Sequence, residues 1–227
     1  MGGTQPVLKA IYRLAWKDVM ADFRHRSTFS SMLFFSVAVL LVFQAAFEPD
    51  PREAQRLVPG LLWTTVLFTT IMGLGRVFQS EEENGAFEGL MLAPLPRGAI
   101  FFGKWLGNLT LSLMVMVMLV PLTLILFNVT LWSHVPMLLF LLFLGTMGLT
   151  ALGVLLAAMT QTARSRETLL ALLLLPLVSP LLIAGVQAMA VVITTGDLSG
   201  PWLNLLLIFD AIYLALAPWG FGWLVEE

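Results

Sequence analysis

The sequence contains no cysteine, few charged residues and two histidines. Without cysteine, the chain forms no disulfide, holds no thiolate metal site and has no cysteine nucleophile. Charged residues make up 11% of the 227 residues, whereas a soluble domain has roughly a quarter. That is too little polar side chain to cover a surface that faces water. Because 59% of the residues are hydrophobic, we expect the solvent of this chain to be a lipid bilayer.

Residue patterns for catalysis or ligand binding are also scarce. No basic patch with interleaved aromatic residues is present, so we expect no nucleic-acid partner. His25 and His134 fall on opposite sides of the predicted membrane and cannot share a metal. For His134 we favour an interfacial histidine over an axial haem ligand. The segment Gly98–Lys104 has P-loop spacing, but Trp105 replaces the hydroxyl residue that holds Mg²⁺ and the required preceding strand is missing. We therefore expect no enzyme and no directly bound metal or cofactor.

Long apolar runs predict six transmembrane helices in one membrane domain, residues 1–227. At about 20 residues per crossing, the spans cover residues 28–47, 57–78, 100–127, 134–159, 168–194 and 202–224. The first run is close to a full span, which argues against a signal peptide. Pro121, Pro176 and Pro180 lie inside the third and fifth runs, where we expect kinks whose freed carbonyls are satisfied by neighbouring helices.

An amphipathic helix is predicted before the first span, over residues 8–24. Apolar residues recur there at alternating steps of three and one, which keeps them on one helical stripe. A cationic helix with Trp16 and Phe23 on its apolar face is expected to lie in the membrane interface. A water-soluble helix packed on a partner is the alternative. The predicted fold class is thus all-α: six transmembrane helices plus an N-terminal interfacial helix.

The cations are distributed unevenly between the two predicted faces of the membrane. Five lie in the N-terminal segment, three in or beside the second loop and two in the fourth loop, whereas the opposite face has two, both in the first loop. Lysine and arginine are enriched in cytoplasmic loops. We therefore expect a multi-pass protein of the cytoplasmic (inner) membrane, with both termini and the second loop in the cytoplasm.

The second loop, residues 79–98, is the core of the longest polar interruption in the chain. It begins with Glu81, Glu82 and Glu83, and the pair Asn84-Gly85 then indicates a turn. A short amphipathic segment follows, with Phe87, Leu90 and Met91 at helical spacing and prolines after it. Two interpretations fit these residues: a short helix that docks on a partner protein, or a connector that lies on the lipid headgroups.

Two polar residues, Asp210 and Arg76, fall within predicted spans. Placing Asp210 in a span costs about 2.5–3.5 kcal/mol on insertion scales, so it should face the bundle rather than lipid. We favour a structural interhelical hydrogen bond near Tyr213 over contact with a proton or substrate. The fourth span also has a stripe of small residues that should pack against another helix: Thr146, Thr150, Gly153 and Ala157.

Several segments, taken in order, resemble the membrane subunit of the cytochrome c maturation ABC transporter, haem exporter protein B (CcmB). The resemblance covers nearly the whole chain in length, polarity and number of spans. The similar segments are Lys17-Asp18 through Phe35, Pro59–Trp63, Arg76–Phe78, Glu83–Pro96 running on to Gly103-Lys104, Ala157–Thr160 with Arg164, the pair Pro176 and Pro180, and Phe209–Tyr213.

The resemblance implies an ABC-2-type permease that recruits a separate ATPase subunit and works beside a haem-handling membrane subunit. In this family, ATP hydrolysis is tied to release of the haem-loaded periplasmic chaperone. ATP would bind the partner subunit, and haem would be handled by the complex. The second loop would be a coupling loop whose apolar and acidic residues contact the ATPase. A generic ABC-2 exporter of lipid, drug or glycan and a non-transporting membrane scaffold are the alternatives.

Overall fold

A computed structural model of the chain describes residues 4–25, 28–78, 96–161, 163 and 165–224. Within these ranges the elements are α1 (Thr4–His25), α2 (Thr28–Phe47), α3 (Pro51–Leu74), α6 (Arg97–Leu126), the 3₁₀ helix η1 (Trp132–His134), α7 (Val135–Met159), α8 (Arg166–Thr195) and α9 (Pro201–Leu224). Six of the described helices are long and apolar enough to span a membrane, and α7 is counted there together with η1. The prediction of an all-α membrane fold is confirmed.

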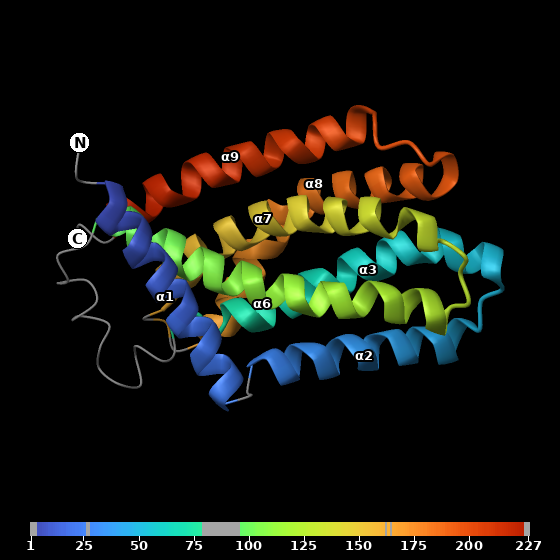
Figure 1. The fold of residues 1–227 in the computed structure, drawn as a ribbon, viewed down its shortest axis with the longest axis horizontal. Coiled ribbons are helices and arrows are strands. Elements are labelled where there is room, and N and C mark those ends of the chain that lie inside the picture. Colours follow the sequence, from blue (N-terminus) through green and yellow to red (C-terminus); the bar gives the residue numbers. More distant parts are fainter. Residues whose placement is uncertain (1–3, 26–27, 79–95, 162, 164, 225–227) are drawn as a thin grey trace.

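The six spans run side by side, and α1 lies across one end of them (Figure 1). The start of α1 and the end of α9 lie at this end, which we call the termini end; the connections from α2 to α3, from α6 to α7 and from α8 to α9 lie at the far end. Exposed tryptophans mark both ends: Trp16, Trp219 and Trp223 at the termini end and Trp132 at the far end. Tryptophan is enriched where a span leaves the hydrocarbon core, so these rings mark the two membrane surfaces.

Three helix starts differ clearly from the sequence prediction. The N-terminal helix was expected from residue 8, but α1 begins at Thr4. The second span was expected from residue 57, but α3 begins at Pro51 because the Asp50 carboxylate accepts hydrogen bonds from the backbone N–H groups of Arg52 (2.8 Å) and Glu53 (2.9 Å). The bond from Glu53, followed by that from Arg52, holds the pKa of Asp50 below its usual range. The second loop was expected to reach residue 98, but α6 already begins at Arg97, directly after Pro96.

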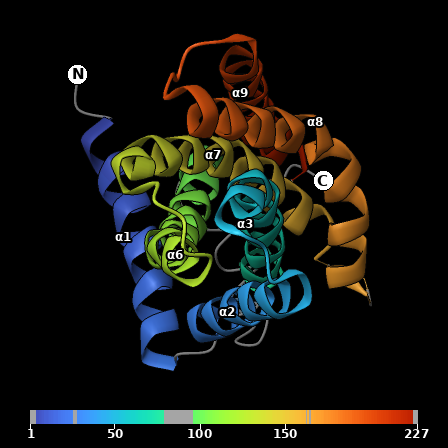
Figure 2. The ribbon, with the colours of Figure 1, turned by 90° about the vertical axis from the view of Figure 1, so that its right-hand side faces the viewer.

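The centre of the bundle is α7, which contacts α3, α6, α8 and α9 (Figure 2). On α3, the Trp63 ring is fully buried and lies against Gly145 of α7 and Gly185 of α8. A Cβ atom at either glycine would overlap the indole, so both positions have to be glycine for the three helices to approach this closely.

The stripe of small residues on α7 is buried along its whole length. Gly153 lies against the Leu74 side chain of α3, and the Thr146 hydroxyl lies 3.3 Å from the sulfur of Met116 on α6. The predicted helix packing at this stripe is confirmed.

The fifth span, α8, continues through Pro176 and Pro180 and changes direction along its length (Figure 2). Because Pro180 has no N–H, the carbonyl of Pro176 loses its usual helical donor. The Ser179 hydroxyl donates to that carbonyl instead, at 2.8 Å. The freed carbonyl is therefore satisfied from within the same helix, and not by a neighbouring helix as predicted.

Candidate functional site

The described residues on both sides of the second loop lie at the termini end of the bundle, and we call them the base of this loop. Residues 79–95 connect Phe78, just after α3, to Pro96, just before α6. The predicted contact residues Glu81, Glu82, Glu83, Phe87, Leu90 and Met91 lie outside the described residues. The loop has two stems, Arg76–Phe78 after α3 and Pro96–Arg97 at the start of α6.

The first stem is held by Lys104, which projects from the second turn of α6. The residue is 2% exposed, and its Nζ lies 3.0 Å from Oδ2 of Asp18 on α1. The same ammonium group donates to the Val77 carbonyl at 2.9 Å and lies 5.5 Å from the centroid of the Phe78 ring. A buried charge is costly unless it is paired and hydrogen-bonded. Lys104 therefore joins α1, α6 and the first stem through one ammonium group.

Aromatic packing holds the same stem to the last helix. The buried Phe78 ring stacks nearly parallel to Phe221 of α9, with centroids 6.4 Å apart and an interplanar angle of 13°. Phe221 also packs against Phe101 of α6, at 5.7 Å. The second stem reaches α9 as well, because Nη1 of Arg97 donates to the Gly222 carbonyl at 3.2 Å. Both ends of the loop are thus fixed to the bundle.

The P-loop-like segment takes no part in nucleotide chemistry in this geometry. Residues 98–104 belong to α6, whereas a P-loop needs an irregular turn before its helix. The lysine that would reach phosphate is occupied by Asp18 and the Val77 carbonyl.

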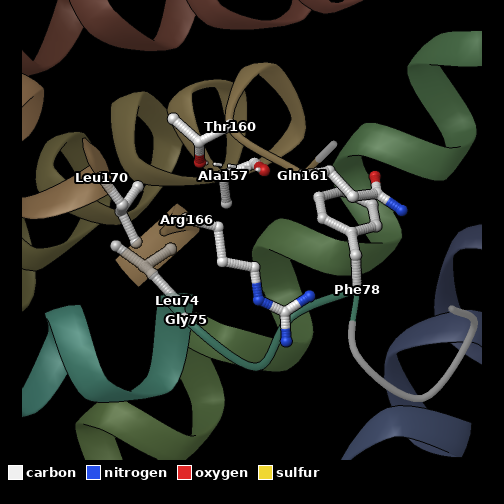
Figure 3. Close-up of a pocket in the computed structure, with 8 residues that line it drawn as sticks. All are labelled: Leu74, Gly75, Phe78, Ala157, Thr160, Gln161, Arg166 and Leu170. Atoms are coloured by element: carbon white, nitrogen blue, oxygen red, sulfur yellow. Dashed lines mark hydrogen bonds between the residues drawn. The ribbon is translucent and has the colours of Figure 1, made fainter. Parts of the chain in front are cut away.

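A small cavity opens beside the base, between the end of α3, the end of α7 and the start of α8 (Figure 3). Its volume is about 10 Å³, room for about one water molecule. A haem or nucleotide does not fit there. The lining residues are Leu74, Gly75, Phe78, Ala157, Thr160, Gln161, Arg166 and Leu170.

A second acid of α1 organises the corner between α1 and α2. The Asp22 carboxylate accepts hydrogen bonds from the backbone N–H groups of Thr28 (2.9 Å) and Phe29 (2.8 Å), at the start of α2. A carboxylate at a helix N-terminus satisfies free donors and complements the helix dipole. Neither this cap nor the Asp18–Lys104 pair was predicted. The signal available in the sequence is that Asp18 and Asp22 lie four residues apart, on one helical face.

Asp210 lies in α9, inside the membrane-spanning bundle, and is 5% exposed. Its Oδ1 accepts a hydrogen bond from the backbone N–H of Gly148 on α7, at 3.1 Å. One turn further along α9, the Tyr213 hydroxyl donates to the Leu177 carbonyl of α8. These two contacts join α9 to α7 and α8. Arg76 is half-buried in the turn that follows α3, at the termini end of its span.

Six spans, an amphipathic helix across one end and a polar loop with fixed stems define a multi-pass integral membrane protein. Residues 9–226 match the family described as CcmB protein. The chain belongs to this family.

Several curated relatives support the assignment. Heme exporter protein B of Pseudomonas aeruginosa is 33% identical over 196 residues, which cover 86% of this chain and 87% of that protein. The proteins of the same name from Paracoccus denitrificans and Bradyrhizobium diazoefficiens are 30% and 29% identical. Those alignments cover 89% and 82% of this chain and 92% and 83% of the respective relatives.

Proposed function

We propose that this chain is the membrane subunit of an ABC transporter complex for c-type cytochrome biogenesis. A separate subunit binds and hydrolyses ATP, and the chain itself is not catalytic. Hydrolysis is coupled to haem delivery, or to release of the haem-loaded periplasmic chaperone, beside a haem-handling membrane subunit. The name of the relatives, heme exporter protein B, supports the link to haem.

The observation that carries the coupling role is the attachment of both stems of the second loop. Lys104 and Phe221 hold Val77 and Phe78, and Arg97 is hydrogen-bonded to α9. A partner that moves such a loop also moves α1, α6 and α9, because these contacts join both stems of the loop to the three helices. A loop that merely connects two spans has no need of a buried ion pair at its stem.

In this proposal Phe87, Leu90 and Met91 fill a groove on the ATPase subunit, and Glu81, Glu82 and Glu83 contact its basic rim. Burying a side chain of the size of leucine or phenylalanine contributes roughly 1.5–3 kcal/mol. An exposed carboxylate contributes much less, about 0–1 kcal/mol. The apolar contacts should therefore dominate the affinity.

We expect the double substitution Phe87→Ala/Leu90→Ala to detach the ATPase and abolish ATP-dependent activity while the protein still inserts into the membrane. The measurement is retention of the ATPase by tagged variants purified in detergent at two ionic strengths. The matched comparison is neutralisation of Glu81, Glu82 and Glu83 together. That change should weaken association mildly, and more at low salt than at high salt. If the apolar double variant retains the ATPase like the wild type, the loop lies on headgroups and the coupling role is wrong.

We also propose that the termini end faces the cytoplasm and the far end the periplasm, because ten of the twelve lysines and arginines fall in or beside the N-terminal segment and the second and fourth loops of the sequence. Since the chain lacks cysteine, labelling of a single introduced cysteine reports the side of the membrane on which that residue lies, with no background from other cysteines of the chain. A cysteine at Glu227 should be protected from an impermeant thiol reagent in intact cells, whereas one at Arg52 should be labelled. Labelling at Glu227 would refute this orientation.

A further inference from the structure

The two long sides of α1 differ in charge because its two acids both face the bundle. Asp18 is paired with Lys104, and Asp22 caps α2. On the same side, Leu14 lies against Gly103 and Ala15 against Gly107, both on α6. The described part of α1 contains no other acid, so its outward side carries no negative side chain.

Exposed apolar and basic side chains cover the outward side of α1. The exposed apolar residues are Leu8, Tyr12, Trp16, Met20 and Phe23. The rings of Tyr12 and Trp16 stack, with centroids 6.1 Å apart. Lys9, Arg13 and Arg24 are exposed as well. An α-helix turns by about 100° per residue, so these three cations lie along one edge of the apolar stripe, the edge that is farther from the bundle. We call these eight residues the outward face of α1.

The position of this face matches the boundary between lipid and water. It lies across the termini end, where the adjacent rings of Trp219 and Trp223 on α9, with centroids 5.9 Å apart, are also exposed. A helix at this depth places its aromatic rings among the upper acyl chains and its cations at the level of the phosphates. A surface with only cations at that level is complementary to negatively charged headgroups.

We propose that the outward face of α1 binds anionic phospholipid headgroups of the leaflet at the termini end. The aromatic and aliphatic side chains hold the helix in the interface, and Lys9, Arg13 and Arg24 select negatively charged lipids from neutral ones. This inference concerns lipid binding by the isolated chain, and it does not depend on the proposed coupling role of the second loop.

The test uses the full-length chain reconstituted in phosphatidylcholine that contains a minor fraction of phosphatidylglycerol. Spin-labelled forms of the two lipids report their relative affinity for the protein surface. A cation near an anionic surface contributes roughly fivefold in affinity. We expect the wild type to prefer phosphatidylglycerol by about fivefold or more, with the preference falling as ionic strength rises. The substitutions Lys9→Gln, Arg13→Gln and Arg24→Gln together should remove most of the preference.

Two control variants separate the charge on α1 from other effects. The charge-preserving set Lys9→Arg, Arg13→Lys and Arg24→Lys should keep the preference. Removing the far-end cations with Arg52→Gln/Arg56→Gln should leave it in place too. Since all three α1 cations are exposed, helix content and gel-filtration behaviour should match the wild type in every variant.

Two outcomes would overturn the proposal. One is a wild-type chain that shows no preference for phosphatidylglycerol. The other is a triple glutamine variant that keeps the wild-type preference. If the isolated chain shows no lipid preference and the triple variant fails instead to retain the ATPase, the outward face docks a protein and not a lipid surface. Failure of the second loop to bind the ATPase leaves all these lipid measurements unchanged.

Discussion

Replacing Asp18 with alanine is expected to destabilise the protein by about 3 kcal/mol, because it leaves the Lys104 ammonium buried without its carboxylate. Lys104 itself is 2% exposed, so bulk water solvates its ammonium group poorly. The measurement is the free energy of unfolding in mixed detergent micelles, with thermal stability as a second readout. We expect the first stem of the loop to loosen as well, since Lys104 also holds the Val77 carbonyl.

The neighbouring lysine provides a matched control. Lys17 lies 3.2 Å from the same carboxylate but its side chain is 51% exposed, so Lys17→Ala should cost at most about 1 kcal/mol. Replacing both partners of the buried pair, in Asp18→Ala/Lys104→Met, should recover part of the stability lost in the single variant, because no buried charge remains unpaired. Equal stabilities for Asp18→Ala and Lys17→Ala would show that Asp18 does not neutralise Lys104.

The second large effect is expected where α9 meets α7. A Cβ atom on Gly148 would overlap the Asp210 carboxylate, so Gly148→Ala should force the two helices apart and cost about 2 kcal/mol. The matched control is Gly60→Ala on α3, where the added Cβ has no atom within 4 Å apart from its chain neighbours and the backbone of its own helix. That change should be neutral or slightly stabilising, since alanine favours helix over glycine.

Substitutions of Asp210 separate a structural role from proton transfer. We propose that Asp210 is structural. Asparagine can accept the same hydrogen bond from the Gly148 N–H, so Asp210→Asn should keep most of the yield of c-type cytochrome. Leucine cannot accept it, so Asp210→Leu should lose about 1–2 kcal/mol of stability and much of the yield. If Asn lowers the cytochrome yield as severely as Leu while the protein stays folded, proton exchange at Asp210 is required and the structural role is wrong.

Hydropathy predicted the spans well because a span requires one property, a run of apolar residues long enough to cross the bilayer. It placed the start of α3 several residues late, since Arg52, Glu53 and Arg56 are polar although they already belong to the helix. The information for that start lies in Asp50, which caps the first turn. Capping is local chemistry, and a window averaged over a span does not detect it.

The candidate site was harder to predict because its contacts join residues that are distant in the sequence. The amphipathic pattern of residues 8–24 correctly placed Trp16 and Phe23 on an exposed face, but it treated Asp18 as one more polar residue. Whether an acid faces water or a buried lysine depends on what packs against the helix. The partner, Lys104, lies far along the chain inside an apolar run, and no periodicity links the two.

The position of Trp63 has a consequence for the order in which the protein is built. The ribosome synthesises α3 early, whereas the two glycines that receive the indole belong to α7 and α8 and are made much later. During translation, therefore, the ring of Trp63 enters the membrane before its binding surfaces exist. The nascent chain completes its centre only when the fourth and fifth spans have left the translocon, and until then the first spans are held by membrane insertion rather than by their final neighbours.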